Sequence, residues 1–149
     1  SNTAIALGER FFVGFTSSVA QPTNVEPSTL TNTIGMAQLS SDQTQFYLVY
    51  GGSAAQTAIP MGTALGPPSG NTLNAYEFSI YSPQSLSATY FVQATNILSG
   101  TTFQTVLSGV STIVPPSGTL LAWRIWKTPN TGATAVAYDL STVYIETDT

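Results

Sequence analysis

The chain is a succession of short segments in which apolar and polar residues alternate, and turn-forming residues separate these segments. No helix-length window carries apolar residues at i, i+3, i+4 and i+7 without an interrupting Gly or Pro. Alternation with a period of two residues is the pattern of a half-buried β-strand. The sequence therefore predicts strands at residues 10–16, 33–38, 44–50, 73–81, 88–94, 101–107, 119–127 and 133–147.

Proline and glycine clusters separate the expected strands. The segments at 66–70 and 115–118 both contain Pro-Pro-Ser-Gly and are expected to be loops. Gly51-Gly52 ends the strand at 44–50. Many short strands at fairly regular spacing, with no helix between them, are typical of sandwiches and barrels. We expect an all-β fold: an antiparallel two-sheet β-sandwich, jelly-roll-like, forming a single domain over residues 1–149.

Charged residues make up only 7% of the chain, against about 25% in ordinary soluble domains. The net charge is −4, and the cations are Arg10, Arg124 and Lys127. Nucleic-acid binding needs several cations on one face, so we expect no nucleic-acid partner. No apolar run approaches the roughly 18 residues of a membrane span, so we expect no membrane insertion. A surface rich in hydroxyls and poor in charge is common in virion proteins and adhesins that pack against their own copies.

The chain contains no His and no Cys, which removes Ser-His and Cys-His catalysis and most zinc sites. Glycoside hydrolysis by two carboxylates stays formally open. Glu77, however, lies in the middle of an expected strand, where it is interpreted as solvated or paired with an Arg. Asp42 follows two serines and is interpreted as an Asx-turn residue, not as a calcium ligand. We expect no enzyme, no cofactor and no metal.

Exposed aromatic rings beside polar side chains are the best candidates for binding, because sugars present both C–H faces and hydroxyls. Trp126 and Arg124 share one face of an expected strand, and Asn130 follows in the next turn. Tyr47 and Tyr81 are further candidates that are expected to point outward. The alternative for Trp126, which we favour, is a contact buried in a second layer or at a subunit interface.

Three segments carry a resemblance to a known family: RFFVGFTS at 10–17, EPSTL at 26–30 continuing to IGM at 34–36, and YIETD at 144–148. Their order and spacing resemble a domain of phage tail-fibre and other virion structural proteins, in which a segment similar to 73–81 also occurs. The resemblance covers nearly the whole chain. It implies a β-sandwich in a virion or adhesin, and a homotrimer, and it brings no catalytic motif.

Members of that family carry further strands before the equivalent of the first strand here, which implies that this chain is the C-terminal piece of a longer one. The expected function is attachment of a phage tail fibre to the host surface, through a glycan or a protein, together with trimer assembly and contact with other virion proteins. Its place would be the extracellular surface of the virion, on the tail or the capsid. Two alternatives remain open: a purely structural virion or capsid-decoration domain, and a carbohydrate-binding module of a secreted enzyme.

Overall fold

The strands of the chain form two antiparallel sheets. The computed structural model describes residues 8–20, 24–67, 74–84, 86, 88–129 and 139–146. Within these ranges there are eight strands, two single-turn 3-10 helices and no α-helix. The elements are β1 (Arg10–Thr16), η1 (Pro27–Thr29), β2 (Thr33–Leu39), β3 (Asp42–Gly51), β4 (Ile59–Pro60), η2 (Thr63–Leu65), β5 (Tyr76–Tyr81), β6 (Thr89–Asn96), β7 (Thr102–Ser108) and β8 (Ala122–Thr128).

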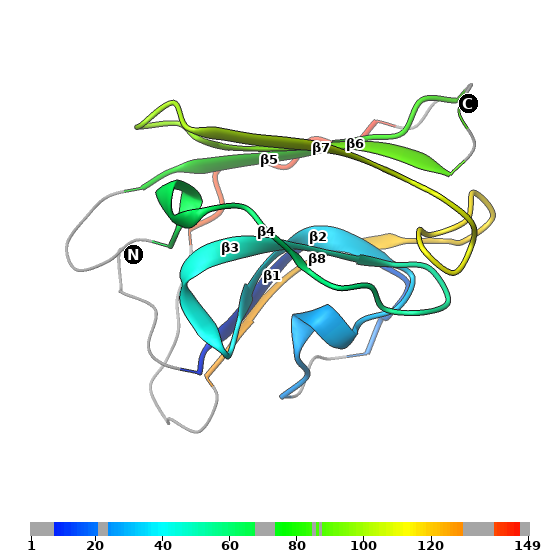
Figure 1. The fold of residues 1–149 in the computed structure, drawn as a ribbon, viewed down its shortest axis with the longest axis horizontal. Helices are drawn as coiled ribbons and strands as arrows, with labels where there is room; N and C mark the ends of the chain where they lie inside the picture. The colour runs from blue at the N-terminus through cyan, green and yellow to red at the C-terminus, as the bar shows by residue number, and fades with distance from the viewer. Residues whose placement is uncertain are drawn as a thin grey trace.

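One sheet has five strands in the order β4-β3-β2-β1-β8, and the other has three in the order β5-β6-β7. The three-stranded sheet lies over one face of the five-stranded sheet (Figure 1). This arrangement confirms the expected antiparallel two-sheet sandwich. Strand β8 returns to pair with β1 after the chain has formed the other sheet. Such a return beside the first strand is the Greek-key connection from which jelly rolls are built.

Strand positions follow the alternation of the sequence closely. The segment expected at 10–16 is β1, and the other expected strands up to residue 127 overlap β2, β3, β5, β6, β7 and β8. The expected long last strand at 133–147 is wrong where it can be checked, because residues 139–146 form no strand and are exposed. Its residues favour extended structure, but a strand also needs a neighbouring strand, and neither of the two described sheets includes this segment.

The main core lies between the two sheets. Strands β2 and β3 contribute from one side, and β6 and β7 from the other. Met61, Leu65 and Val114, which lie outside the strands, belong to the same core. The buried strand residues are Ile34, Met36, Phe46, Leu48, Val92, Ala94 and Leu107. The inward faces are those that alternation predicts, because every second residue of a strand points to the same side.

A second core covers the opposite face of the five-stranded sheet. It consists of Phe12, Ala37, Leu39, Val49 and Trp126. Leu30, Tyr47 and Ala58 pack against it, and η1 lies on this side of the sheet, away from the three-stranded sheet (Figure 1). All residues of β2 are therefore buried, whereas alternate residues of β5 and β7 are exposed. Among the described residues, the outer face of the three-stranded sheet therefore carries the exposed side chains of a sheet.

Candidate functional site

Trp126 lies in the second core and not on the surface. Its exposed fraction is 9%, and its ring stacks on Phe12 with ring centroids 5.8 Å apart and an interplanar angle of 23°. The two residues are cross-strand neighbours in the β1–β8 ladder. The placement agrees with the buried-contact alternative and leaves the Trp126 ring no face for a ligand.

Arg124 is also occupied within the chain. Its guanidinium donates hydrogen bonds to the carbonyl oxygens of Val19, at 3.1 Å, and Ala20, at 3.0 Å. This side chain therefore fastens the segment that follows β1. Asn130, the third member of the expected Trp126 site, lies outside the described residues.

The other two cations of the chain have carboxylate partners. Arg10 Nε lies 2.7 Å from Glu26 Oε2, and Lys127 Nζ lies 3.1 Å from Glu9 Oε2 with both side chains nearly inaccessible. The second pair is close, although Glu9 Oε2 receives no well-aligned hydrogen bond. Because every Lys and Arg of the chain has an internal partner, none of them is placed to hold an anionic ligand.

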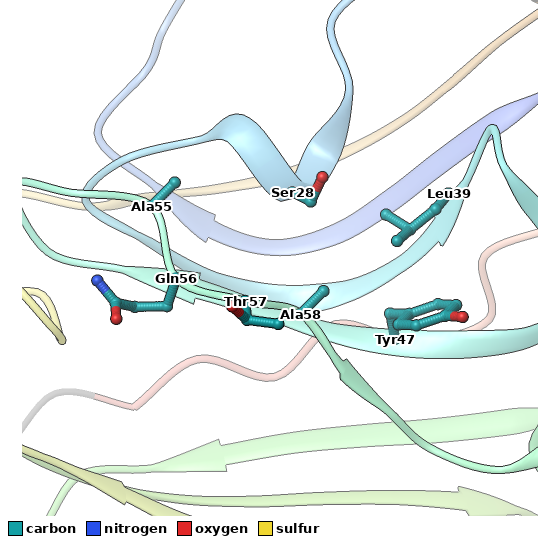
Figure 2. A pocket seen from close by; sticks show the side chains of 7 residues that line it. All are labelled: Ser28, Leu39, Tyr47, Ala55, Gln56, Thr57 and Ala58. Carbon is teal, nitrogen blue, oxygen red and sulfur yellow. The ribbon is translucent and has the colours of Figure 1, made fainter.

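Tyr47 lines an open groove of about 470 Å³ beside the second core. Figure 2 shows the groove between Ser28 of η1, Leu39 of β2, Tyr47 of β3 and the segment 55–58 that precedes β4. The walls are built mainly from small side chains, Ala55, Thr57 and Ala58 among them.

The Tyr47 hydroxyl is committed to the turn between β2 and β3. It donates a hydrogen bond to Asp42 Oδ2 at 2.6 Å, and Gln45 Nε2 donates to the same oxygen at 2.9 Å. Asp42 Oδ1 accepts from the Thr44 hydroxyl at 2.6 Å and from the Thr44 backbone N–H at 2.8 Å. The last bond confirms the expected Asx turn.

These bonds displace both ionisation equilibria in the turn. Hydrogen bonds from Thr44, then from Tyr47 and Gln45, stabilise the carboxylate and lower the pKa of Asp42 well below its usual range. The same carboxylate raises the pKa of the Tyr47 phenol. Gln56 is occupied as well, since its amide donates to Ala54 O and Thr112 O, each at 3.1 Å. The polar groups of the groove thus hold the fold together, and few remain for a ligand.

The outer face of the three-stranded sheet offers a different arrangement, ordered in rows across the strands. Cross-strand pairing aligns Tyr81, Phe91 and Val106 in one row and Ser79, Gln93 and Gln104 in the next. These six side chains line one shallow depression. Tyr81 is 61% exposed, Phe91 41% and Val106 53%. An apolar row thus lies directly beside an amide and hydroxyl row.

Hydrogen bonds between side chains fix the polar part of this face. Gln104 Nε2 donates to Gln93 Oε1 at 2.8 Å, and Gln93 Nε2 donates to the Thr95 hydroxyl at 3.2 Å. The hydroxyls of Thr95 and Thr102 are 3.2 Å apart and continue the chain of bonds. The Gln104 carbonyl Oε1 accepts no bond from a described residue. It can therefore accept a hydrogen bond from a ligand without breaking one of these contacts.

Sequence reasoning identified one member of this face, Tyr81, and missed Phe91, Gln93 and Gln104. The signal was present in the alternation. Placing Tyr90, Val92 and Ala94 on one side of a strand puts the residues between them on the other side. The aromatic ring packing of Tyr81 on Phe91, with centroids 6.2 Å apart and tilted by 37°, needs the register of β5 on β6, which alternation does not supply.

The described ranges contain neither a candidate metal site nor a candidate membrane-spanning helix. No group of three or more Asp, Glu, His or Cys side chains is gathered closely enough there to hold a metal ion. No helix in the same ranges has the length and apolar character needed to cross a membrane.

Comparison with known proteins gives no relative: no family model, no curated protein and no solved structure matches the chain.

Proposed function

We propose that this chain is a recognition and assembly module of a phage tail fibre or related virion adhesin. It attaches to a glycan of the host surface through the outer face of the β5-β6-β7 sheet. The observation that carries the proposal is the apolar row of Tyr81, Phe91 and Val106 beside the polar row of Ser79, Gln93 and Gln104.

The two rows match the two kinds of surface that a sugar presents. A pyranose ring has apolar C–H patches that pack on aromatic rings, and its hydroxyls exchange hydrogen bonds with amides. Tyr81 and Phe91 expose their rings, and the Gln93–Gln104 bond holds both amides in place before a ligand arrives. Such preorganisation reduces the entropy cost of binding.

The charge of this face indicates which glycans it accepts. Glu77 on β5 is exposed beside the polar row, and the cations of the chain are bound elsewhere. A carboxylated or sulfated sugar would meet repulsion and no compensating cation. The proposed ligand is therefore a neutral glycan.

The proposal places the protein on the extracellular surface of the virion as a homotrimer. Support comes from the low charge content and from the exposed apolar residues of the C-terminal segment, such as Val143, Tyr144 and Ile145. The same segment favours the second candidate, a structural virion or capsid-decoration module that binds copies of itself and no receptor.

A glycan array probed with the labelled full chain tests the attachment function. We expect binding to neutral glycans, and at least a tenfold loss of affinity in Phe91→Ala, equal to about 1.4 kcal/mol. Leu120→Ala is the matched control, because this apolar side chain is 92% exposed and does not line the depression. Silence of the whole array, or equal binding by wild type and Phe91→Ala, would contradict attachment through this face. Glycan binding by a monomer would favour the carbohydrate-binding module instead.

A further inference from the structure

The edges of the two sheets differ in how well they are protected against further pairing. The strands that end the sheets are β4, β8, β5 and β7. An edge strand exposes unpaired backbone groups, and short length, proline or charge prevents other chains from adding to it. Strand β4 has two residues and ends in Pro60, β5 carries Glu77, and β8 carries Arg124 and Lys127.

Strand β7 has none of these protections. Its seven residues, TFQTVLS, include no charge and no proline. Its register on β6 runs without a bulge from Thr102 to Ser108. Because the backbone N–H of Asn96 binds the carbonyl of Thr101, the alternation of an antiparallel ladder turns the backbone groups of Thr102, Gln104 and Val106 away from β6. Among the described residues these groups have no backbone partner, so a row of donors and acceptors faces outward along this edge.

The C-terminal segment, residues 139–146, has a sequence that favours a strand, but it belongs to neither of the two described sheets. Residues 139–146 are all exposed and form no regular structure. Val143, Tyr144 and Ile145 are β-branched or aromatic and favour strands, and Tyr144 is 80% exposed. The Tyr144 hydroxyl donates to Glu146 Oε2 at 2.8 Å. Side chains two residues apart meet in this way when the backbone is extended.

We infer that residues 140–145 of one copy add as a strand to the β7 edge of a second copy. Each half supplies what the other lacks: the edge offers unpaired backbone groups, and the segment offers a β-prone sequence whose apolar side chains are in water. Both halves occur in the same chain, so a second copy always carries the complement. The pairing would extend the three-stranded sheet by one strand, in the mode known as β-augmentation.

The symmetry of this contact determines the kind of assembly. A segment that docks on a different surface makes a heterologous contact, which closes into a ring or continues as a filament. A ring of three copies is the homotrimer of the proposed function. Pairing of β7 with β7 would instead be isologous and would give a dimer. The inference rests on the assembly part of the proposed function and is independent of its glycan-binding part.

Size-exclusion chromatography with light scattering on the full chain tests the inference. The wild type is expected at the mass of three chains, and Tyr144→Pro at the mass of one. The substitution removes a backbone N–H of the segment together with the β-prone side chain of Tyr144, which is 80% exposed. It should leave the fold of each chain intact, because the segment pairs with no described strand of its own chain. Circular dichroism checks this, and Ser141→Ala, which should stay trimeric, is the matched control.

Mixing two defective variants gives the sharper result. Val106→Pro removes an outward-facing donor of β7 and should also be monomeric. Tyr144→Pro retains an intact β7, and Val106→Pro retains an intact segment, so a mixture of the two at raised concentration should form a two-chain complex. A monomeric wild type, or a Tyr144→Pro variant that stays oligomeric, would overturn the inference. A Tyr144→Pro variant that remains a dimer would indicate β7–β7 pairing.

Glycan affinity per chain separates the two proposals. If Tyr144→Pro is monomeric but binds glycan with wild-type affinity per chain, both stand. If the chains assemble as inferred and no glycan binds, the attachment function alone fails.

Discussion

Gly14 of β1 and Gly35 of β2 are direct cross-strand partners within the five-stranded sheet. A Cβ atom added to Gly14 would lie 2.4 Å from the Cα of Gly35, and one added to Gly35 would lie 2.6 Å from the Phe12 ring. Real Cβ atoms do not approach other atoms so closely. Gly35 therefore leaves the space that the Phe12 ring of the second core occupies, and Gly14 allows the backbone of β2 to approach β1 closely.

We expect Gly35→Ala to lower the free energy of unfolding by about 1–3 kcal/mol, the usual cost of overpacking. The Phe12 ring and the Val13 carbonyl both stand in the way of the new methyl group. Urea unfolding followed by fluorescence measures the loss. Gly118→Ala is the matched control, because no atom lies within 4 Å of its added Cβ, and it should change stability by less than about 0.5 kcal/mol. Equal stability of the two variants would show that β1 and β2 are not paired in this register.

Trp126→Ala should destabilise the fold by about 3–5 kcal/mol, the range for truncating a large buried aromatic side chain. The substitution removes the ring that stacks on Phe12 and leaves a cavity in the second core. Urea unfolding gives the magnitude, and glycan binding by the milder Trp126→Phe variant provides the comparison. That variant should bind as the wild type does. A variant of normal stability that has lost glycan binding would mean that Trp126 contacts the ligand.

The sequence predicts the strands because alternation is a local property that the sandwich preserves. Alternation also places Trp126 and Trp123 on opposite faces of one strand, since they are three residues apart, but it does not tell which ring is buried: Trp126 belongs to the second core, whereas Trp123 is half-buried. Burial of Trp126 is the interpretation that the sequence favours, but local alternation cannot identify what covers this face, because the cover includes η1 and Ala58, which are distant in the sequence. The same cover makes Tyr47 a half-buried wall residue.

The candidate site on the three-stranded sheet was less accessible to sequence reasoning. Alternation puts Phe91 and Gln93 on one side of β6, but their neighbours Tyr81 and Gln104 depend on register, which hairpin geometry sets. The segment 139–146 was expected to be part of a strand and is not one. Its residues favour a strand, yet strand formation depends on a partner that local sequence does not reveal.

The carboxylate of Glu26 connects η1 to the five-stranded sheet and makes stability depend on pH. It lies 2.7 Å from Arg10 Nε and accepts hydrogen bonds from the Ser40 hydroxyl at 2.6 Å and the Ser40 N–H at 3.0 Å. Partial burial alone would raise the pKa of Glu26, but the bonds from Ser40 and Arg10 outweigh it, so the pKa falls below 4.5.

A carboxyl whose pKa is lower in the folded than in the unfolded chain stabilises the fold when ionised. This contribution is fully present above about pH 4.5, the value for an unperturbed glutamate, and is lost as the pH falls through the lower pKa of the folded state. We expect Glu26→Gln to be less stable than wild type at neutral pH and to lose less stability on acidification. Urea unfolding at pH values on both sides of 4.5 measures the two curves, and Ser40→Ala should fall between them. Parallel curves for wild type and Glu26→Gln would show that this carboxylate does not couple folding to pH.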